Sequence, residues 1–372
     1  MRLVELTRCM DLENYIRQKS QKLERGSRRI KDFRVFDFNY IPEKPLMREE
    51  VQPIADAVLR YMKTGIPNHL LIIGSRGCGK TLLVKSLIQT LKSSPSVPRF
   101  VYVNCRHHNT SFKILAEILQ VRPRGYALDE LWHAFQSKYS GRLVLVLDEV
   151  DLISEKDRYK DILYLLSRSE NNYMTLMLSN NPRFHTLLDS SVRSTLQPEI
   201  IHFKNYNLGQ MEEILRQRAR LGLRKTALGR LRHIAALTVH NTNSDVRVAI
   251  KTLYLCALEP DAEVEGNFQR ARRDIAADIL GDLNDRNLLI LRAALADREA
   301  YVKSVYTLYR RLSQSCGVAP FSYVYFYSNL SYLQSLGLIL LVSTKVRRTY
   351  TNRIQTLFEP ETLESVWKAR FG

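Results

Sequence analysis

GSRGCGKT at residues 74–81 is the stretch that decides the fold of this 372-residue chain. An apolar run at 70–73 precedes it, and residues 82–88 follow with apolar side chains at helical spacing. A strand, a glycine-rich loop and a helix in this order form a phosphate-binding loop, whose backbone N–H groups and helix N-terminus surround phosphate oxygens. In such a loop Lys80 reaches the β- and γ-phosphates, and the Thr81 hydroxyl holds Mg²⁺. The segment therefore predicts nucleotide binding.

The composition indicates a polyanionic partner. The chain carries 56 lysines and arginines against 38 acidic residues, a net charge of +18. Most proteins with a phosphate-binding loop have no need of such a charge, so nucleic acid is the leading interpretation. A surface charged for solubility, or an adaptation to a hot or salty cell, is the alternative. The length leaves room for two or three domains.

The cysteines and apolar runs exclude several classes of protein. The five cysteines are scattered without a C-x-x-C pair, which argues against a disulfide framework and a zinc module. Cys105, His107 and His108 lack a second ligand pair, so no metal site is predicted there. No apolar run is long enough to span a membrane, and charges interrupt the N-terminal segment where a signal peptide would be apolar. We expect a cytoplasmic protein associated with the nucleoid.

Strands and helices alternate around the loop. Strands separated by helices at this spacing imply a mostly parallel sheet covered on both faces. Between residues 208 and 283 only helical periodicity remains, which predicts a separate helical domain. The further strands are expected near 100–104, 143–148, 173–179 and 199–203, and helices near 49–63, 111–119 and 128–139.

The two ends of the chain have patterns of their own. After residue 283, three helices lead to strands at 338–342 and 354–358 that bracket the basic segment 345–348, a winged helix-turn-helix pattern. Residues 1–33 predict a basic amphipathic helix followed by a loose break at Gly26 and Ser27. Its basic face is either solvated or in contact with DNA.

Two polar groups stand at strand ends where hydrolysis would need them. Residues 143–149, LVLVLDE, place Asp148 to hold Mg²⁺ and Glu149 to orient and deprotonate a water molecule. The next strand ends at Asn180, whose amide could bind that water or the γ-phosphate. The alternative is a solvated acidic turn and a turn-forming asparagine.

Taken together, the segments resemble the AAA+ ATPases, and among them the archaeal initiators of the origin-recognition (Orc/Cdc) family. The resemblance implies an α/β AAA+ fold: a basic segment at 1–33, a P-loop base domain at 34–205, a helical lid domain at 206–282 and a winged-helix domain at 283–372. The matching segments occur in the family's order: FDFNYIPEKPLMREE, GSRGCGKT, YVNCRHHNTSFKILAEIL, LVLDEVD, LSNNP, LDSSVRSTLQPEIIHF and SDVRVAI.

The resemblance also implies roles for single residues. Asn180 corresponds to the sensor-1 residue, Arg247 to the sensor-2 arginine of the lid, and Arg193 to the arginine that contacts a neighbouring subunit's nucleotide. Without the resemblance, both arginines would be read as exposed helix residues. The implied ATP/ADP-binding residues are Tyr40, Ile41, Pro42 and Arg48 near the adenine, and Gly74, Ser75, Arg76, Gly77, Cys78, Gly79, Lys80, Thr81 and Leu82 in the loop.

DNA contacts are expected on three elements. The insertion RPRGY at 122–126 corresponds to the family's DNA-contacting motif, and the third winged-domain helix and the wing supply the rest. A solvated loop and tyrosines that fill the core are the alternatives. The candidates are Arg122, Arg124, Tyr325, Ser328, Asn329, Arg347, Arg348 and Arg353.

Three departures from the family stand out. Cys78 occupies a region where a small hydroxyl residue is usual, and the wing tip has no glycine. Ser191 stands where many members carry an arginine, which leaves Arg193 as the only candidate for a contact across subunits.

The sequence thus predicts an ATP-dependent replication initiator that binds double-stranded origin DNA and hydrolyses ATP slowly as a switch. By resemblance, its partners are paralogous initiator subunits and a replicative minichromosome-maintenance-type helicase. Two alternatives remain: an ATP-bound DNA-binding regulator without significant hydrolysis, and a clamp-loader or motor-type AAA+ ATPase.

Overall fold

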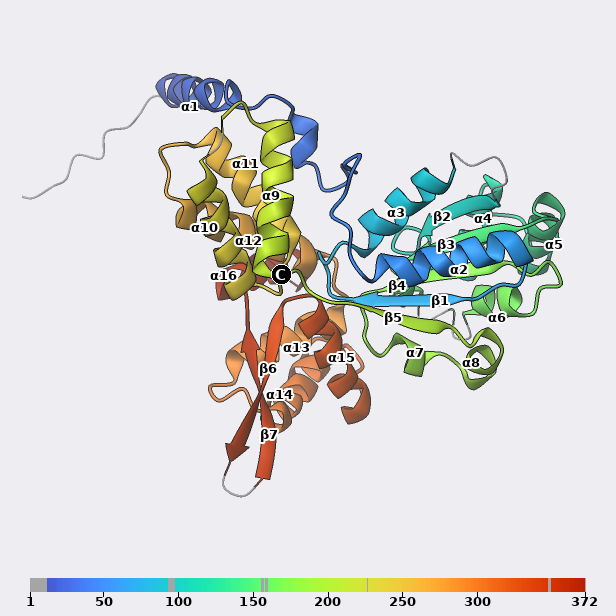
Figure 1. Ribbon diagram of the computed structural model, residues 1–372. Helices are drawn as coiled ribbons and strands as arrows, with labels where there is room; N and C mark the ends of the chain where they lie inside the picture. The colour runs from blue at the N-terminus through green and yellow to red at the C-terminus, as the bar shows by residue number, and fades with distance from the viewer. Residues whose placement is uncertain are drawn as a thin grey trace, which may run out of the picture.

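The computed structural model describes residues 12–92, 98–154, 157, 160–225, 227–346 and 349–371. Its base is a five-stranded, all-parallel sheet in the order β2-β3-β4-β1-β5, so the strand before the P-loop lies inside the sheet (Figure 1). The predicted parallel sheet is confirmed. The strands are β1 Leu70–Gly74, β2 Arg99–Asn104, β3 Leu143–Asp148, β4 Met174–Ser179 and β5 Glu199–Phe203.

Alternate strand residues pack into two cores, one on each face of the sheet. Leu70 and Ile72 face the core under α2 (Val51–Thr64) and α3 (Lys80–Leu91), whereas Leu71 and Ile73 face the opposite core. Since strand side chains alternate between faces, continuous apolar strands give two cores. The second core is covered by α4 Ser111–Leu119, α5 Leu128–Lys138, α6 Asp161–Ser167, α7 Phe184–Leu187 and α8 Ser190–Leu196.

Four helices form the lid: α9 Leu208–Gly222, α10 Leu228–Asn241, α11 Val246–Leu258 and α12 Val264–Gly281. The N-terminal helix α1 (Leu12–Ser27) packs on α11. The loose break expected at Gly26 is wrong, because the helix continues through Ser27. A Cβ at Gly26 would lie 2.1 Å from the carbonyl oxygen of Leu258, so this glycine permits a close approach between helices.

The winged-helix domain contains α13 Asp285–Ala296, α14 Val302–Ser315, α15 Tyr323–Ser335, β6 Ile339–Val346, β7 Thr349–Thr356 and α16 Pro360–Phe371. The strands reach further toward the tip than predicted, with Val346 paired to Thr349. Beyond Leu341 the two strands carry mostly polar residues, so the sequence offers no apolar alternation from which their outer halves could be predicted. The sequence analysis missed α16, although Pro360 and the spacing of Leu363, Val366 and Trp367 are typical of a helix.

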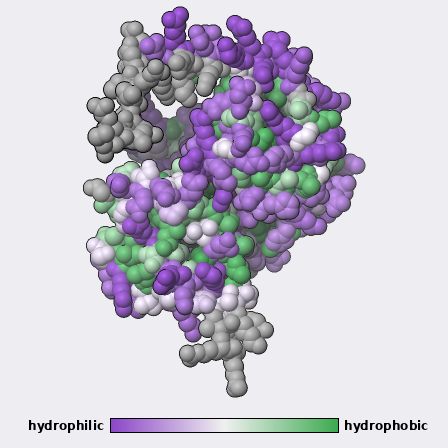
Figure 2. Space-filling view, turned by 90° about the vertical axis from the view of Figure 1, so that its left-hand side faces the viewer, coloured by the Kyte–Doolittle hydropathy of each residue, from purple (hydrophilic) through white to green (hydrophobic). Residues whose placement is uncertain are grey.

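The lid and the winged-helix domain share one hydrophobic core. Ile275 and Ile279 of α12 belong to the same buried cluster as Leu288 and Leu291 of α13. In Figure 1 the lid and the winged-helix domain lie one above the other, beside the base. The face of lid and winged helix in Figure 2 is mostly hydrophilic, with smaller hydrophobic areas between the polar ones. None of the described helices is long and apolar enough to span a membrane.

Candidate nucleotide-binding and DNA-binding sites

The P-loop is folded around the ammonium group of Lys80. Its Nζ donates hydrogen bonds to the carbonyl oxygens of Gly74 (2.7 Å) and Ser75 (3.0 Å), and to Oδ1 of Asn180 (3.0 Å). Gly77 and Gly79 have φ of +81° and +93°, a left-handed conformation that favours glycine. The backbone N–H groups of the loop, the N-terminus of α3 and the buried ammonium group of Lys80 therefore lie close together.

Thr81 and Asp148 lie together beside this loop. Thr81 Oγ1 donates to Asp148 Oδ2 at 2.9 Å, and the Tyr102 hydroxyl donates to the same oxygen at 2.6 Å. Burial raises the pKa of Asp148 and also that of Tyr102. A hydroxyl and a carboxylate oxygen are hard ligands that suit Mg²⁺, so this pair fits the predicted metal role. Tyr102 was not among the predicted site residues.

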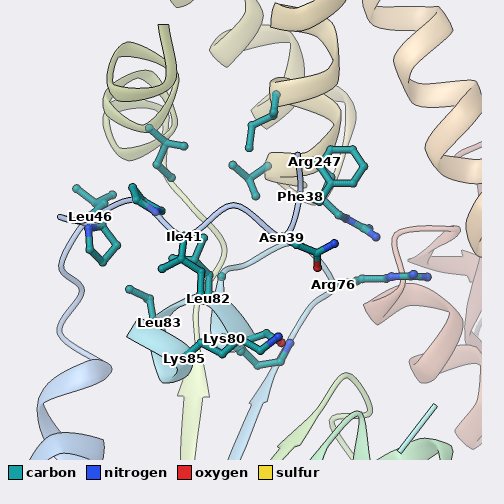
Figure 3. A pocket seen from close by; sticks show the side chains of 18 of the residues that line it. Phe38, Asn39, Ile41, Leu46, Arg76, Lys80, Leu82, Leu83, Lys85 and Arg247 are labelled. Carbon is teal, nitrogen blue, oxygen red and sulfur yellow. The ribbon is translucent and has the colours of Figure 1, made fainter. Parts of the chain in front are cut away.

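A cavity of about 320 Å³ extends from the P-loop toward the lid. Lys80, Thr81 and Asp148 form its polar end. Residues of the segment before α2 and of the lid close the other end (Figure 3). A site with one polar and one apolar end suits a nucleotide, whose phosphates and base differ in the same way. The apolar lining includes Phe38, Ile41, Pro42, Leu46, Ile214, Val246 and Ile250.

The predicted adenine contacts divide into two groups. Ile41 and Pro42 line the cavity, whereas Tyr40 and Arg48 do not. The guanidinium of Arg218 lies over the Tyr40 ring, 4.9 Å from its centroid. Arg218 gave no sequence signal, because it contacts the N-terminal segment only in the folded chain.

Arg48, predicted to contact adenine, is bound by other groups of the chain. Its buried guanidinium donates to the carbonyl oxygens of Cys78 (3.0 Å) and Lys204 (2.8 Å), and it pairs with Glu50 at 2.7 Å. It also lies over the ring of Tyr206, 4.7 Å from the centroid. Arg48 therefore supports the P-loop from outside the cavity, and its contact with adenine stays a prediction.

The P-loop residues also differ in what they face. Gly74, Ser75 and Cys78 do not line the cavity; the Ser75 hydroxyl bonds the Asn205 side chain, and Cys78 is buried. The loop and α3 residues that line it are Arg76, Gly77, Gly79, Lys80, Thr81 and Leu82.

Glu149 lines the cavity but is held by an arginine that the sequence analysis did not single out. Arg106, in the turn after β2, contacts it through Nε–Oε2 at 2.7 Å and Nη2–Oε1 at 3.1 Å. Burial alone would raise the pKa of Glu149, but the hydrogen bonds and charge of Arg106, with the charge of Arg76, lower it. Glu149 has φ of +54°, an uncommon conformation for a side-chain-bearing residue, of a kind that clusters at functional sites.

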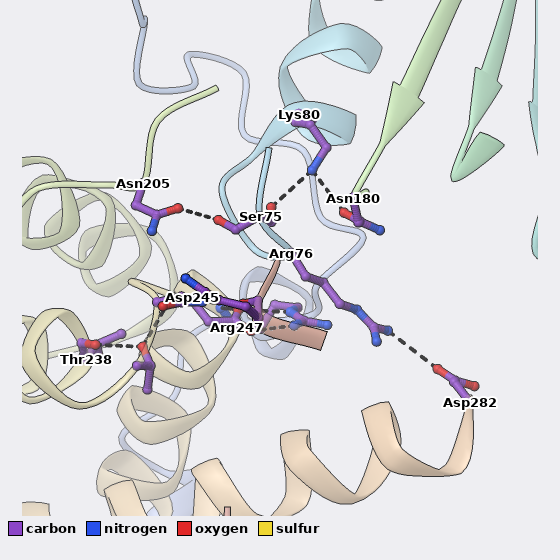
Figure 4. A network of polar contacts seen from close by, with 12 residues as sticks. Ser75, Arg76, Lys80, Asn180, Asn205, Thr238, Asp245, Arg247 and Asp282 are labelled. Carbon is purple, nitrogen blue, oxygen red and sulfur yellow. Dashed lines mark hydrogen bonds and ion pairs between the residues drawn. The ribbon is translucent and has the colours of Figure 1, made fainter. Parts of the chain in front are cut away.

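The two predicted arginines occupy different places. Arg247, on the first turn of α11, lines the cavity, and its Nε donates to Asp245 Oδ1 at 2.9 Å (Figure 4). Arg193, on α8, lies outside this cavity. Its Nε is buried without a hydrogen-bond partner among the described residues.

The predicted DNA-binding residues lie on separate surfaces. Arg122 and Arg124 are exposed in the connection between α4 and α5. These two helices lie at the end of the base away from the lid (Figure 1). Tyr325 is exposed on the first turn of α15, and Arg353 is exposed on β7. Ser328 and Asn329 are partly buried, and Asn329 Nδ2 donates to the Tyr325 carbonyl at 2.9 Å. Arg347 and Arg348 lie outside the described residues.

Another face of α15 packs against the base. The Arg183 guanidinium lies over the Tyr327 ring, 5.7 Å from its centroid. Burial raises the pKa of Tyr332, and the charge of Asp151 from the base raises it further. The helix predicted to read DNA is therefore partly occupied by contacts within the chain.

These features define a AAA+ fold with a lid and a C-terminal winged-helix domain. The family model described as AAA domain matches residues 66–188, which contain the P-loop, Asp148 and Asn180. Among solved structures, the Aeropyrum pernix ORC1 protein in complex with DNA has a TM-score of 0.65 at 22% identity, covering 92% of this chain and 98% of that one. The Aeropyrum pernix ORC2 protein (ADPNP-ADP complexes) has a TM-score of 0.60 at 24% identity, covering 92% and 99%. The predicted fold class is confirmed.

The chain resembles the archaeal ORC1-type DNA replication proteins, as its motifs predict. It is 27% identical over 372 residues to ORC1-type DNA replication protein 1 of Methanothermobacter thermautotrophicus, covering 91% of this chain and 96% of the relative. It is 26% identical over 338 residues to the Archaeoglobus fulgidus protein of the same name, covering 82% of each.

Proposed function

We propose that this protein is an ATP-dependent replication initiator that binds duplex origin DNA. One observation carries the proposal: the cavity is closed by the lid, and α12 of the lid shares its core with the winged helix. A nucleotide that moves the lid would therefore move the domain that holds DNA. The relatives named ORC1-type DNA replication proteins, similar along most of the chain, support this assignment.

ATP hydrolysis would use the residues gathered at the polar end of the cavity. Lys80 and Asn180 would bind the phosphates, and Thr81 and Asp148 would hold Mg²⁺, which supplies charge neutralisation at the phosphates. Glu149 would accept a proton from the attacking water. Arg247, and Arg193 from a neighbouring subunit, would stabilise negative charge on the transferred phosphoryl group.

DNA binding would combine the winged helix with the insertion in the base. Arg353, together with Arg347 and Arg348 of the wing, would contact backbone or minor groove, and Arg122 and Arg124 would contact phosphates at a distance from them. The net charge of +18 suits a protein that contacts DNA through several elements. Recruitment of a replicative helicase, association with paralogous subunits and a place in the nucleoid belong to the same proposal.

An ATP-bound DNA-binding regulator is the second candidate. The ion pair between Glu149 and Arg106 occupies the proposed base, and Arg247 is paired with Asp245. Both pairs favour slow turnover. The two candidates differ only in whether ATP is hydrolysed.

Duplex binding with and without ATP tests the proposal. We expect wild-type protein to bind fragments of the host chromosome with an affinity that depends on ATP. Lys80→Ala should lose ATP binding and that dependence but keep ATP-independent binding. Lys63→Ala, an exposed lysine of α2, is the matched control. The full chain is used because the winged helix shares its core with the lid. Equal affinity with and without ATP in the wild type would refute the proposal.

A further inference from the structure

We propose that Arg218 is a positioning residue for nucleotide binding. It fastens the segment at 35–46, which we call the strap, to the lid, so that the lid carries the wall that faces the nucleoside of ATP. The proposal rests on the proposed ATP binding and adds which part of ATP the lid recognises, and through which residue.

The first step concerns the guanidinium of Arg218, on α9 of the lid. The residue is 3% exposed, and it donates hydrogen bonds to the carbonyl oxygens of Val35 and of Tyr40, the latter at 3.0 Å. It also lies over the Tyr40 ring, 4.9 Å from the centroid. A guanidinium presents several N–H donors in a rigid fork, so this one side chain fixes two points of the strap at once.

The second step concerns the other contacts between the strap and the lid. The Phe36 side chain belongs to a buried cluster that consists mostly of lid residues. A Cβ on Gly222, the last residue of α9, would lie 2.8 Å from the Phe36 ring, so glycine permits this close contact. Gln217 Nε2 donates to the carbonyl oxygen of Lys44. The strap is therefore packed on the lid, although it precedes the base in the chain.

The third step concerns what the strap faces. Phe38, Ile41 and Pro42 line the nucleotide cavity, and Arg218 lines it with them. Figure 3 shows Phe38 and Ile41 above Lys80 of the P-loop. Because the end at Lys80 is polar and the end at the strap is apolar, the phosphates would bind the base and the nucleoside would bind the strap and lid. ATP would then bridge the two domains, whereas a phosphate chain without a nucleoside would reach the base alone.

Affinities for two ligands test this arrangement in the full-length protein. Arg218→Met removes both hydrogen bonds and should raise the Kd for ATP roughly tenfold, because the wall that faces the nucleoside is no longer held. The Kd for inorganic tripolyphosphate, which lacks the nucleoside, should stay the same. Arg218→Lys keeps the charge without the fork and should have an intermediate affinity for ATP. Arg220→Met, at an exposed position of the same helix, is the matched control and should change neither affinity.

A second readout needs no nucleotide. In nucleotide-free protein, amide hydrogen exchange of residues 36–41 should be faster in Arg218→Met than in wild type, with exchange of β1 and α3 unchanged. Unchanged exchange in the strap, an unchanged Kd for ATP, or an equal loss of affinity for both ligands would overturn the proposal. If Arg218→Met does not fold, the same measurements on Arg218→Lys decide. A wild type that does not bind ATP would refute the proposed function as well, whereas ATP binding that Arg218→Met leaves unchanged would refute the role of Arg218 alone.

Discussion

Replacing Arg48 by methionine separates a structural from a ligand-binding role. The substitution removes three hydrogen bonds, to Cys78, Lys204 and Glu50, and leaves the partly buried Glu50 carboxylate without its cationic partner. Breaking a buried ion pair by removing one member costs about 3–5 kcal/mol. A domain of this size loses about 2–4 °C in Tm for each kcal/mol, so we expect a fall of about 10 °C.

The double variant Arg48→Met/Glu50→Gln refines this prediction. It leaves no unpaired carboxylate, so its Tm should lie above that of Arg48→Met alone. Thermal unfolding and ATP affinity are measured for wild type, both single variants and the double variant. An unchanged Tm combined with a large loss of ATP affinity would refute the structural role and restore the adenine contact that the family resemblance implies.

Three further predictions concern catalysis, DNA and pH. Glu149→Gln should keep ATP binding and lose at least about a hundredfold in single-turnover hydrolysis; unchanged turnover would exclude it as the base. Arg122→Ala with Arg124→Ala should lower the slope of log affinity against log salt by about two, and an unchanged slope would leave the loop solvated. Burial lowers the pKa of His69 from 6.5 to about 4, so its neutral form stabilises the fold above pH 6.5. That contribution, about 3 kcal/mol, is lost as the pH falls from 6.5 to 4. His69→Asn should flatten the fall, and an equal fall in both proteins would contradict the assignment.

The elements that the sequence predicted best are those whose structure is decided by residues close together in the chain. The run at 143–148 has aliphatic residues up to Asp148, and β3 has those bounds. The order and spacing of the segments also indicate that Lys80, Asp148 and Asn180 lie close together. The C-terminal ends of parallel strands meet at the same end of a sheet.

The contacts that decide how the site is held were not local. Arg48 meets Lys204, 156 positions away, and Arg106 meets Asp282 across the lid junction. An arginine in a turn has the same appearance in the sequence whether it is solvated or ion-paired. The partners of Arg48 and Arg106 therefore could not be predicted. The family resemblance identified the motif residues that we propose to face the nucleotide. The residues that hold them in place could be identified only from the structure.

We propose that one free energy couples the nucleotide site to the DNA-binding surface. The direct measurement is the affinity for a non-hydrolysable ATP analogue, with and without a saturating bound duplex. Linkage requires DNA to change analogue affinity by the same factor as the analogue changes DNA affinity, about 5-fold or more. The predicted result is equal factors in the wild type, and a DNA affinity of Lys80→Ala that the analogue does not change. An analogue affinity unaffected by DNA would contradict the account.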